Sequence, residues 1–326
     1  MNLVNISAEY IKTANYALFH NRIPICQAIM ITNTSDNPIE NLQVTCSGKY
    51  ITRYETGLIA IINPGETVRL SPFNVIPDAA KLASLTERVV TEFTIKAIVK
   101  NENTGNSSNE SDISDSHDTT TVGELVCELE LMPFDHWTGI TILPQTIASF
   151  ITPNHPAINN IVVRSAEILK QLTGSSSFNE YQTGDNNDVR QQVPAIFSAL
   201  HETRIVYRSL PASFEVVGQR ITMPDQVLAS KIGNCIELTL LMASVLEAVG
   251  LNSLIIINQG HAFLGVWLVD DCYPCSLCED PAFIEKKCSR GIDEMLVVEC
   301  TELAKEKTSF ETAVSRAEMN LIDHSK

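Results

Sequence analysis

Cys235 and His261 are the residues of this 326-residue chain whose types and spacing point most directly to chemistry. Cys235 follows a Gly-Asn pair and opens a run of apolar residues at helical spacing that extends to Val249. A thiol in the first turn of a helix lies near unpaired backbone N–H groups and the positive end of the helix dipole, which both favour the thiolate. The sequence therefore predicts an activated cysteine nucleophile.

Two strands are expected to return the histidine to this cysteine. Residues 254–258 include three consecutive Ile and predict a strand buried on both faces, and the alternating segment 261–269 predicts a second strand. An antiparallel return would place His261 over the start of the helix, where covalent catalysis needs a base beside the nucleophile. The backbone N–H of Cys235 is the expected oxyanion donor.

A second oxyanion donor is needed within about 3 Å of the developing charge. The sequence offers two candidates, the amide of Gln219 and the side chain of Asn234. Their positions in the sequence do not decide between them.

Two short motifs resemble a known enzyme core. GNC at 233–235 opens an apolar helix and GHAFLGVW at 260–267 forms a strand, which is similar to the core of the transglutaminase-like cysteine peptidases. That family shares its order of cysteine helix, histidine strand and acid strand with the papain-like enzymes. The resemblance implies that Cys235 is the nucleophile, that His261 is the general base and that no cofactor takes part.

The third member of the implied triad is expected on the strand after the histidine strand. LVVECT at 296–301 is the best match and puts Glu299 at the acid position, where the family usually has Asp. Its carboxylate would accept a hydrogen bond from the ring of His261 and so fix the tautomer. The alternatives for this position are Asp270, Asp271 and Asp293.

A wider likeness covers nearly the whole chain. PNHP at 153–156, PASFE at 211–215 and PDQVL at 224–228 resemble the front end of large bacterial helicase-related proteins, in which a transglutaminase-like domain precedes an ATP-driven motor. No P-loop pattern (GxxxxGK[ST]) occurs in this chain. The resemblance implies a role in bacterial (antiviral) defence or regulated proteolysis, with a helicase or ATPase as a partner. A stand-alone relative and a fragment of a longer protein are both open.

The chain predicts an α+β protein with two cored domains. Residues 1–135 contain six or more strand-like segments with polar turns, which favour an immunoglobulin-like or C2-like β-sandwich. Within it, residues 101–121 predict a mobile acidic loop because they are rich in Asn, Ser and Asp. Residues 136–152 form the expected connector, and the resemblance makes 153–326 the transglutaminase-like (papain-like) α+β domain.

Composition limits the partners. The formal charge of −16 and the pI of about 4.8, without a cluster of Lys and Arg, argue against binding to nucleic acid or an anionic membrane. No stretch reaches the ~18 apolar residues of a membrane span, and the N-terminus does not resemble a secretory signal. The expected location is the cytoplasm, and the expected partner is a protein or peptide substrate.

The nine cysteines are expected to be reduced thiols in a cytosolic chain. One group competes with the thiol site for a function, because its close spacing resembles zinc ligation. Three of its members crowd together where zinc sites usually have two separate pairs, so a redox-sensitive surface loop is the alternative. The group is Cys272, Cys275, Cys278 and Cys288.

These features predict a thiol hydrolase, foremost a cysteine protease that acts through Cys235, His261 and Glu299 and an acyl-enzyme. Restricted access of water would instead give a transglutaminase or deamidase that acts on protein glutamine. A catalytically silent scaffold for protein interactions is the non-enzymatic alternative.

Overall fold

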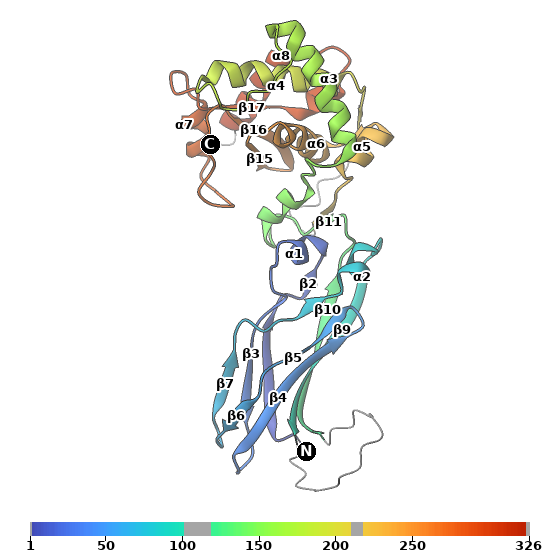
Figure 1. Cartoon of the computed structure of the whole chain (residues 1–326), viewed down its shortest axis with the longest axis vertical. Coiled ribbons are helices and arrows are strands. Elements are labelled where there is room, and N and C mark those ends of the chain that lie inside the picture. The colour runs from blue at the N-terminus through green and yellow to red at the C-terminus, as the bar shows by residue number, and fades with distance from the viewer. Residues whose placement is uncertain (1, 101–118, 210–217, 324–326) are drawn as a thin grey trace, which may run out of the picture. The chain divides into compact units, whose positions relative to one another are not determined.

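The structure is a computed structural model that describes residues 2–100, 119–209 and 218–323. It is a mixed α+β chain that separates into two compact units, Met1–Phe134 and Asp135–Lys326 (Figure 1). Strands dominate the first unit, and the second contains the longer helices. The segment 136–152, expected to be a connector, carries a short strand and a 3-10 helix and belongs to the second unit. The motif at 211–215 lies outside the described residues.

The strands of the first unit form two sheets. One has the order β1-β3-β7, and the other has the order β2-β10-β9-β4-β5-β8, with β6 paired to β4. The pairing is antiparallel except between β2 and β10. Two short helices complete the unit. The bounds are β1 Val4–Tyr10, β2 Thr13–Ala14, α1 Tyr16–His20, β3 Cys26–Asn33, β4 Ile39–Gly48, β5 Ile51–Glu55, β6 Ile59–Ile62, β7 Thr67–Leu70, β8 Ile76–Pro77, α2 Ala79–Ala83, β9 Val89–Lys100 and β10 Thr119–Leu131.

β9 follows the alternation of its sequence. Phe93 and Ile95 are fully buried, whereas Val90 is 59% exposed, because successive side chains of a strand point to opposite faces. β10 pairs with β9 from Thr119 onward, so the last three residues of the loop expected at 101–121 are part of a strand. The β-branched threonines at 119–121 favour this extension. The remainder of that loop, 101–118, lies outside the described residues.

The second unit places its helices around a small antiparallel sheet of order β15-β16-β17. Two further strand pairs, β11 with β13 and β12 with β14, lie outside this sheet. The bounds are β11 His136–Trp137, η1 Pro144–Phe150, α3 Pro156–Thr173, α4 Asn186–His201, β12 Val206–Tyr207, β13 Gln219–Arg220, α5 Pro224–Ser230, β14 Ile232–Gly233, α6 Cys235–Ala248, β15 Ser253–Asn258, β16 His261–Trp267, α7 Pro281–Cys288, β17 Met295–Val298, η2 Cys300–Ala304 and α8 Phe310–Asp323.

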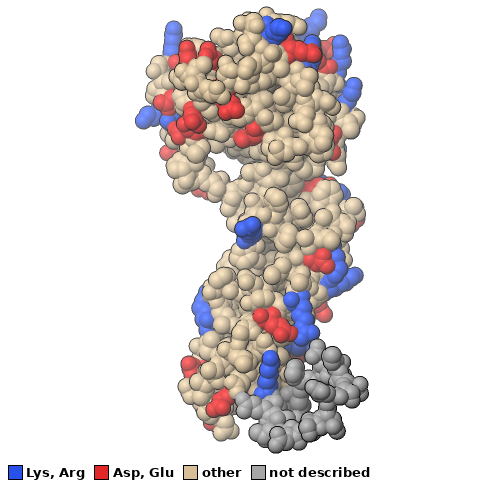
Figure 2. All heavy atoms as spheres, in the orientation of Figure 1, with Lys and Arg blue, Asp and Glu red and all other residues tan. Residues whose placement is uncertain are grey.

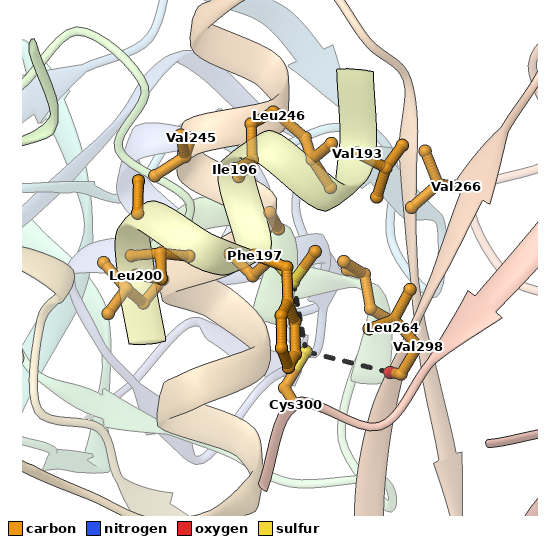
Figure 3. Packing of buried hydrophobic residues seen from close by; sticks show 14 of the residues in the cluster. Val193, Ile196, Phe197, Leu200, Val245, Leu246, Leu264, Val266, Val298 and Cys300 are labelled. Carbon is orange, nitrogen blue, oxygen red and sulfur yellow. Dashed lines mark hydrogen bonds between the residues drawn. The ribbon is translucent and has the colours of Figure 1, made fainter. Parts of the chain in front are cut away.

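The core of the second unit surrounds α6. This helix is predominantly apolar, and its residues from Cys235 to Leu246 are all buried, as expected of a helix enclosed by its neighbours. α4 packs against it, and Phe197 of α4 lies beside Cys300 of η2 and near Leu264 of β16 (Figure 3). The core therefore joins the cysteine helix, the histidine strand and the segment after β17.

β16 is the central strand of its sheet and is buried after its first residue. β15 is an edge strand, and all six of its residues are only partly buried. The prediction that 254–258 would be buried on both faces was therefore wrong, because an edge strand lacks a neighbour on one side. Gly260 makes the turn between the two strands with a φ of +77°, a conformation that glycine adopts at little cost.

Charged side chains are mixed on the surface. On the face shown in Figure 2, the described Lys and Arg side chains are interspersed with Asp and Glu and form no continuous basic area. That face therefore lacks the basic stripe that would follow a nucleic-acid backbone. Of the helices in the described part of the chain, none combines the length and apolar character needed to cross a membrane.

Candidate active site

Cys235 is the first residue of α6, at a firmly capped helix start. The side chain of Asn234 accepts a hydrogen bond from the Glu237 N–H (3.1 Å), and the Glu237 carboxylate accepts one from the Asn234 N–H (2.9 Å), which completes a capping box. Gly233 permits close packing here, since a Cβ at this position would lie 3.2 Å from Leu238 Cδ2. Cys235 itself is 8% exposed. The sulfur is thus held at a fixed point near the surface of the core.

His261 opens β16, and the hairpin with β15 brings it back to the start of α6. Thr239 of α6 ties the two elements together, because its hydroxyl lies 2.8 Å from the carbonyl oxygen of Cys235 and 3.3 Å from that of Ala262. The side chains of Cys235 and His261 are hydrogen bonded. The structure therefore places these two residues side by side, as the sequence predicted.

Glu299 lies on the other side of the histidine. Its Oε2 accepts hydrogen bonds from His261 Nε2 (2.7 Å) and from Asn320 Nδ2 of α8 (2.8 Å). Its Oε1 accepts from the backbone N–H (3.0 Å) and the hydroxyl (2.7 Å) of Thr301. Because Nε2 is bonded to Glu299, Nδ1 is the ring nitrogen left for Cys235. Sulfur, imidazole and carboxylate thus form one hydrogen-bonded row.

Glu299 differs from the prediction in its local structure. β17 ends at Val298, and Glu299 is the N-cap of η2 rather than a strand residue. Its side chain satisfies the N–H of Thr301, as N-cap carboxylates do. Glu299 is 3% exposed. The carboxylate is therefore fixed by the end of the strand as well as by the histidine.

Hydrogen bonds outweigh burial in setting the charges of this row. The bonds to Cys235 and then to Glu299 raise the pKa of His261 to about 10. Burial favours the neutral thiol, but the hydrogen bonds from His261 and from the Ala262 N–H lower the pKa of Cys235 overall. Burial likewise opposes ionisation of Glu299, yet hydrogen bonds from His261 and Thr301 lower its pKa. The arrangement favours a thiolate, an imidazolium and a carboxylate.

Tyr207 also reaches the site, although its sequence context assigns it no role. It lies in β12, which runs parallel to β14 and places Tyr207 opposite Gly233. Its hydroxyl is hydrogen bonded to the side chain and to the backbone of Cys235, and its pKa is raised by burial and by the nearby Cys235. Nothing in the local sequence marks this residue, because the contact depends on pairing between segments far apart in the chain.

The two side chains expected as second oxyanion donors are both buried, with Asn234 4% and Gln219 8% exposed. The side-chain oxygen of Asn234 is engaged in the cap of α6. Gln219 lies in β13, where it pairs with Trp137 of β11. Tyr207 contacts the side chain of Cys235 directly.

The alternative acids are placed elsewhere. Asp293 forms an ion pair with Arg190 (3.4 Å), and Asp271 lies 3.8 Å from the Lys287 ammonium group. Asp270 lines a cavity of about 220 Å³. Glu299 is therefore the carboxylate that the structure brings to His261.

The cysteine group proposed for zinc does not form a metal centre in this structure. Cys272, Cys275 and Cys278 are exposed, and Cys288 is partly buried at the end of α7. Among the residues that the structure describes, no group of three or more His, Cys, Asp or Glu side chains is arranged to hold a metal ion. The zinc alternative therefore has no structural support.

A cavity of about 520 Å³ lies away from the thiol site, beside the start of α4. Its lining is mostly polar, includes Arg190 and contains no Cys, His or Ser. It therefore offers no nucleophile, and its size does not make it a competitor for the catalytic role.

Comparison with known proteins does not place the chain in a family. No family model matches it, and no curated protein matches its sequence significantly. The functional interpretation therefore depends on the geometry of the residues themselves.

Proposed function

We propose that the second unit is a thiol hydrolase, a cysteine peptidase of the transglutaminase-like type. Cys235 is its nucleophile, His261 its general acid and base, and Glu299 the residue that orients the histidine. The observation that carries the proposal is the hydrogen-bonded row from a thiol at a helix start, through an imidazole, to a buried carboxylate.

A purely structural role explains this row poorly. Burying a carboxylate is costly unless its hydrogen bonds are satisfied, and here four donors converge on Glu299. The imidazole side chain of His261 is 29% exposed, so the histidine is not sealed into the core. A buried carboxylate and an imidazolium beside a thiol near the surface are typical of a catalytic site.

The proposed reaction follows from these positions. The Cys235 thiolate attacks a carbonyl carbon, a C–S bond forms, and the electron pair of the C=O bond moves to oxygen. Collapse of this intermediate expels the amine, which takes a proton from the imidazolium of His261. His261 then removes a proton from water, and the resulting hydroxide attacks the acyl-enzyme and releases Cys235.

The fold assignment belongs to the same proposal. The two sheets of the first unit support an immunoglobulin-like or C2-like sandwich, and the order of α6, β16 and β17 supports a papain-like second unit. The cysteine helix, the histidine strand and the acid follow one another in the chain as the papain-like arrangement requires. Fold alone does not imply activity, so the test addresses the thiol directly.

The test compares proteomes. A bacterial lysate is incubated with the wild-type protein, with Cys235→Ala or with Cys272→Ala, and new peptide N-termini are identified by mass spectrometry. Cys272 is an exposed thiol and serves as the matched control. We expect new N-termini with the wild type and the control but not with Cys235→Ala.

Other products would redirect the proposal. Glutamine residues converted to glutamate, or joined to lysine, without chain cleavage would identify a deamidase or a transglutaminase that uses the same acyl-enzyme. A Cys235 that reacts with iodoacetamide no faster than the other eight thiols near neutral pH would leave the silent scaffold.

A further inference from the structure

We propose that Tyr207 is a catalytic residue of this site and that its hydroxyl is the second donor to the oxyanion of the tetrahedral intermediate. This inference rests on the proposed thiol chemistry. It replaces Gln219 and Asn234, the two donors expected from the sequence, with a residue that contacts the nucleophile.

Backbone pairing places Tyr207 next to the nucleophile. The N–H of Val206 donates to the Lys231 carbonyl and the N–H of Arg208 donates to the Gly233 carbonyl, each at 2.8 Å. These two hydrogen bonds flank Tyr207 and hold it against β14, the short strand that leads to Cys235. Its hydroxyl is hydrogen bonded to both the sulfur and the backbone of Cys235.

An ion pair fixes the strand of Tyr207 to the catalytic helix. Arg208 donates to Glu237 Oε1 at 3.0 Å, and Glu237 is fully buried. The same carboxylate accepts from the N–H groups of Thr222 and Asn234, each at 2.9 Å. The residue after Tyr207 and the residue before Cys235 therefore share one carboxylate. This contact preorganises the tyrosine, as a catalytic donor requires.

The chemistry gives this hydroxyl a use at each stage. In the resting site it donates to the Cys235 thiolate. When the C–S bond forms, sulfur loses its negative charge and the former carbonyl oxygen gains it, close to the Cys235 N–H. A hydroxyl within reach of both the sulfur and that N–H can redirect its hydrogen bond from one to the other without transferring a proton. It therefore stabilises the transition state more than the bound substrate.

The environment keeps the tyrosine protonated for this role. Burial and the thiolate raise the pKa of Tyr207, and Glu299 adds a weaker negative field. The positively charged ring of His261 contacts the same sulfur, and its hydrogen bonds go to Cys235 and Glu299. Arg208, the residue after Tyr207, is paired with Glu237. The hydroxyl remains a neutral donor at physiological pH.

Two reagents of different geometry test the proposal without a known substrate. p-Nitrophenyl acetate acylates a thiolate through a tetrahedral oxyanion and expels p-nitrophenolate, whereas iodoacetamide alkylates it by direct displacement of iodide with no oxyanion. The second-order rate constants at Cys235 are measured for both reagents by mass spectrometry, in the wild type and in Tyr207→Phe. Their ratio isolates the oxyanion from any change in thiolate content.

We expect Tyr207→Phe to lower the ratio of acylation to alkylation about 10-fold or more, since one oxyanion donor is commonly worth ~10²–10³ and an activated ester needs less help. Tyr207 is 42% exposed, so the variant should fold, which its thermal melting curve checks. Tyr273→Phe is the matched control, because it removes a hydroxyl hydrogen bonded to a different thiol, Cys278. The control should leave the ratio unchanged.

Each remaining outcome counts against the proposal. Equal slowing of both reagents, which leaves the ratio unchanged, would mean that the hydroxyl serves the thiolate alone. Wild-type rates with both reagents would remove its role altogether. If wild-type Cys235 is no more reactive toward iodoacetamide than the exposed thiols, the proposed thiol chemistry fails first. Failure of the tyrosine is thus distinct from failure of the site.

Discussion

Cys235 and Cys300 are neighbouring thiols of the second unit with opposite chemistry. Cys235 is 8% exposed and has a lowered pKa, whereas Cys300 is fully buried and has a pKa raised well above its usual range. Burial is the largest influence on both, and in both it favours the neutral thiol. Burial alone therefore does not decide which thiol is activated.

The difference lies in what each sulfur contacts. Cys235 meets the His261 ring and the backbone N–H groups of Ala262 and Ile236. Cys300 lies 3.8 Å from the sulfur of Met242 and 3.8 Å from the carbonyl oxygen of Val298, both acceptors. Figure 3 shows the contact with Val298. A thiolate needs donors, and Cys235 has the imidazolium and two backbone N–H groups. At Cys300 the hydrogen bond from the Thr239 side chain is outweighed by burial and by the charge of Glu299.

The largest expected effect is a difference in alkylation between these two thiols. At pH 7 we expect iodoacetamide to label Cys235 at least ~100-fold faster than Cys300, because only the thiolate reacts. The reagent also reaches a buried thiol less easily, which contributes to this ratio. The exposed Cys272 is therefore the better reference. Cys235 should react about 10-fold faster than Cys272 at pH 6.5 despite its burial. Mass spectrometry of quenched samples gives all three rates, and equal rates at Cys235 and Cys272 would contradict the comparison.

Replacement of Glu299 should weaken the activated thiol through the histidine. Glu299→Gln removes the charge behind His261, so the imidazolium should lose its proton at least ~1 pH unit below the wild-type midpoint of about 10. NMR titration of the His261 ring measures this midpoint. Glu294→Gln, which alters an ion pair with Lys287 away from the site, is the control. An unchanged midpoint in Glu299→Gln would show that the carboxylate does not act on the histidine.

The same substitution has a consequence for folding. The raised pKa of His261 contributes stability that is fully present below the unfolded value near 6.5 and is lost as pH rises through about 10. The lowered pKa of Cys235 has the opposite effect, because its contribution is present above the unfolded value near 9 and is lost as pH falls. The two contributions offset each other between about pH 6.5 and 9, so urea denaturation should show a free energy of unfolding that declines only above about pH 9. The decline should be smaller in Glu299→Gln, because its folded-state pKa lies closer to the unfolded one.

The parts of the site that could be predicted are those determined by neighbouring residues. Helical spacing after Gly233 predicted α6, and the Gln259-Gly260 turn between two apolar segments predicted the hairpin that returns His261. Both depend on contacts within a few residues of the chain. The pairing of His261 with Cys235 followed from them.

Long-range contacts could not be predicted in this way. Tyr207 reaches Cys235 through a parallel pair of two-residue strands, which leaves no periodic signal in the sequence. Asn320 reaches Glu299 from the last helix, 21 residues further along the chain, and no local pattern marks this polar contact. The partial burial of β15 depends on its position at the edge of the sheet. A run of consecutive Ile does not indicate which strand takes the edge position.

Asn320 should have a smaller effect than Glu299. Asn320→Leu removes a donor 2.8 Å from Glu299 Oε2, so protonation of the carboxylate should begin at a higher pH. We expect alkylation of Cys235 to fall about 3-fold near pH 5 and to be unchanged near pH 8, as read from the pH–rate profile. Met319→Leu, on an exposed part of the same helix, is the control. A uniform loss across the pH range would instead indicate a general disturbance of α8.

The smallest expected effect is at Cys300. Cys300→Val keeps an apolar side chain of similar size in a fully buried position, so the free energy of unfolding should fall by less than about 1.5 kcal/mol. Alkylation of Cys235 should stay within about 2-fold of the wild type, because the donors around its sulfur are untouched. Urea denaturation and alkylation rates measure the two quantities. A folded Cys300→Val protein with an unreactive Cys235 would mean that the two thiols act as one unit, and the contrast between donors and acceptors would then not explain their chemistry.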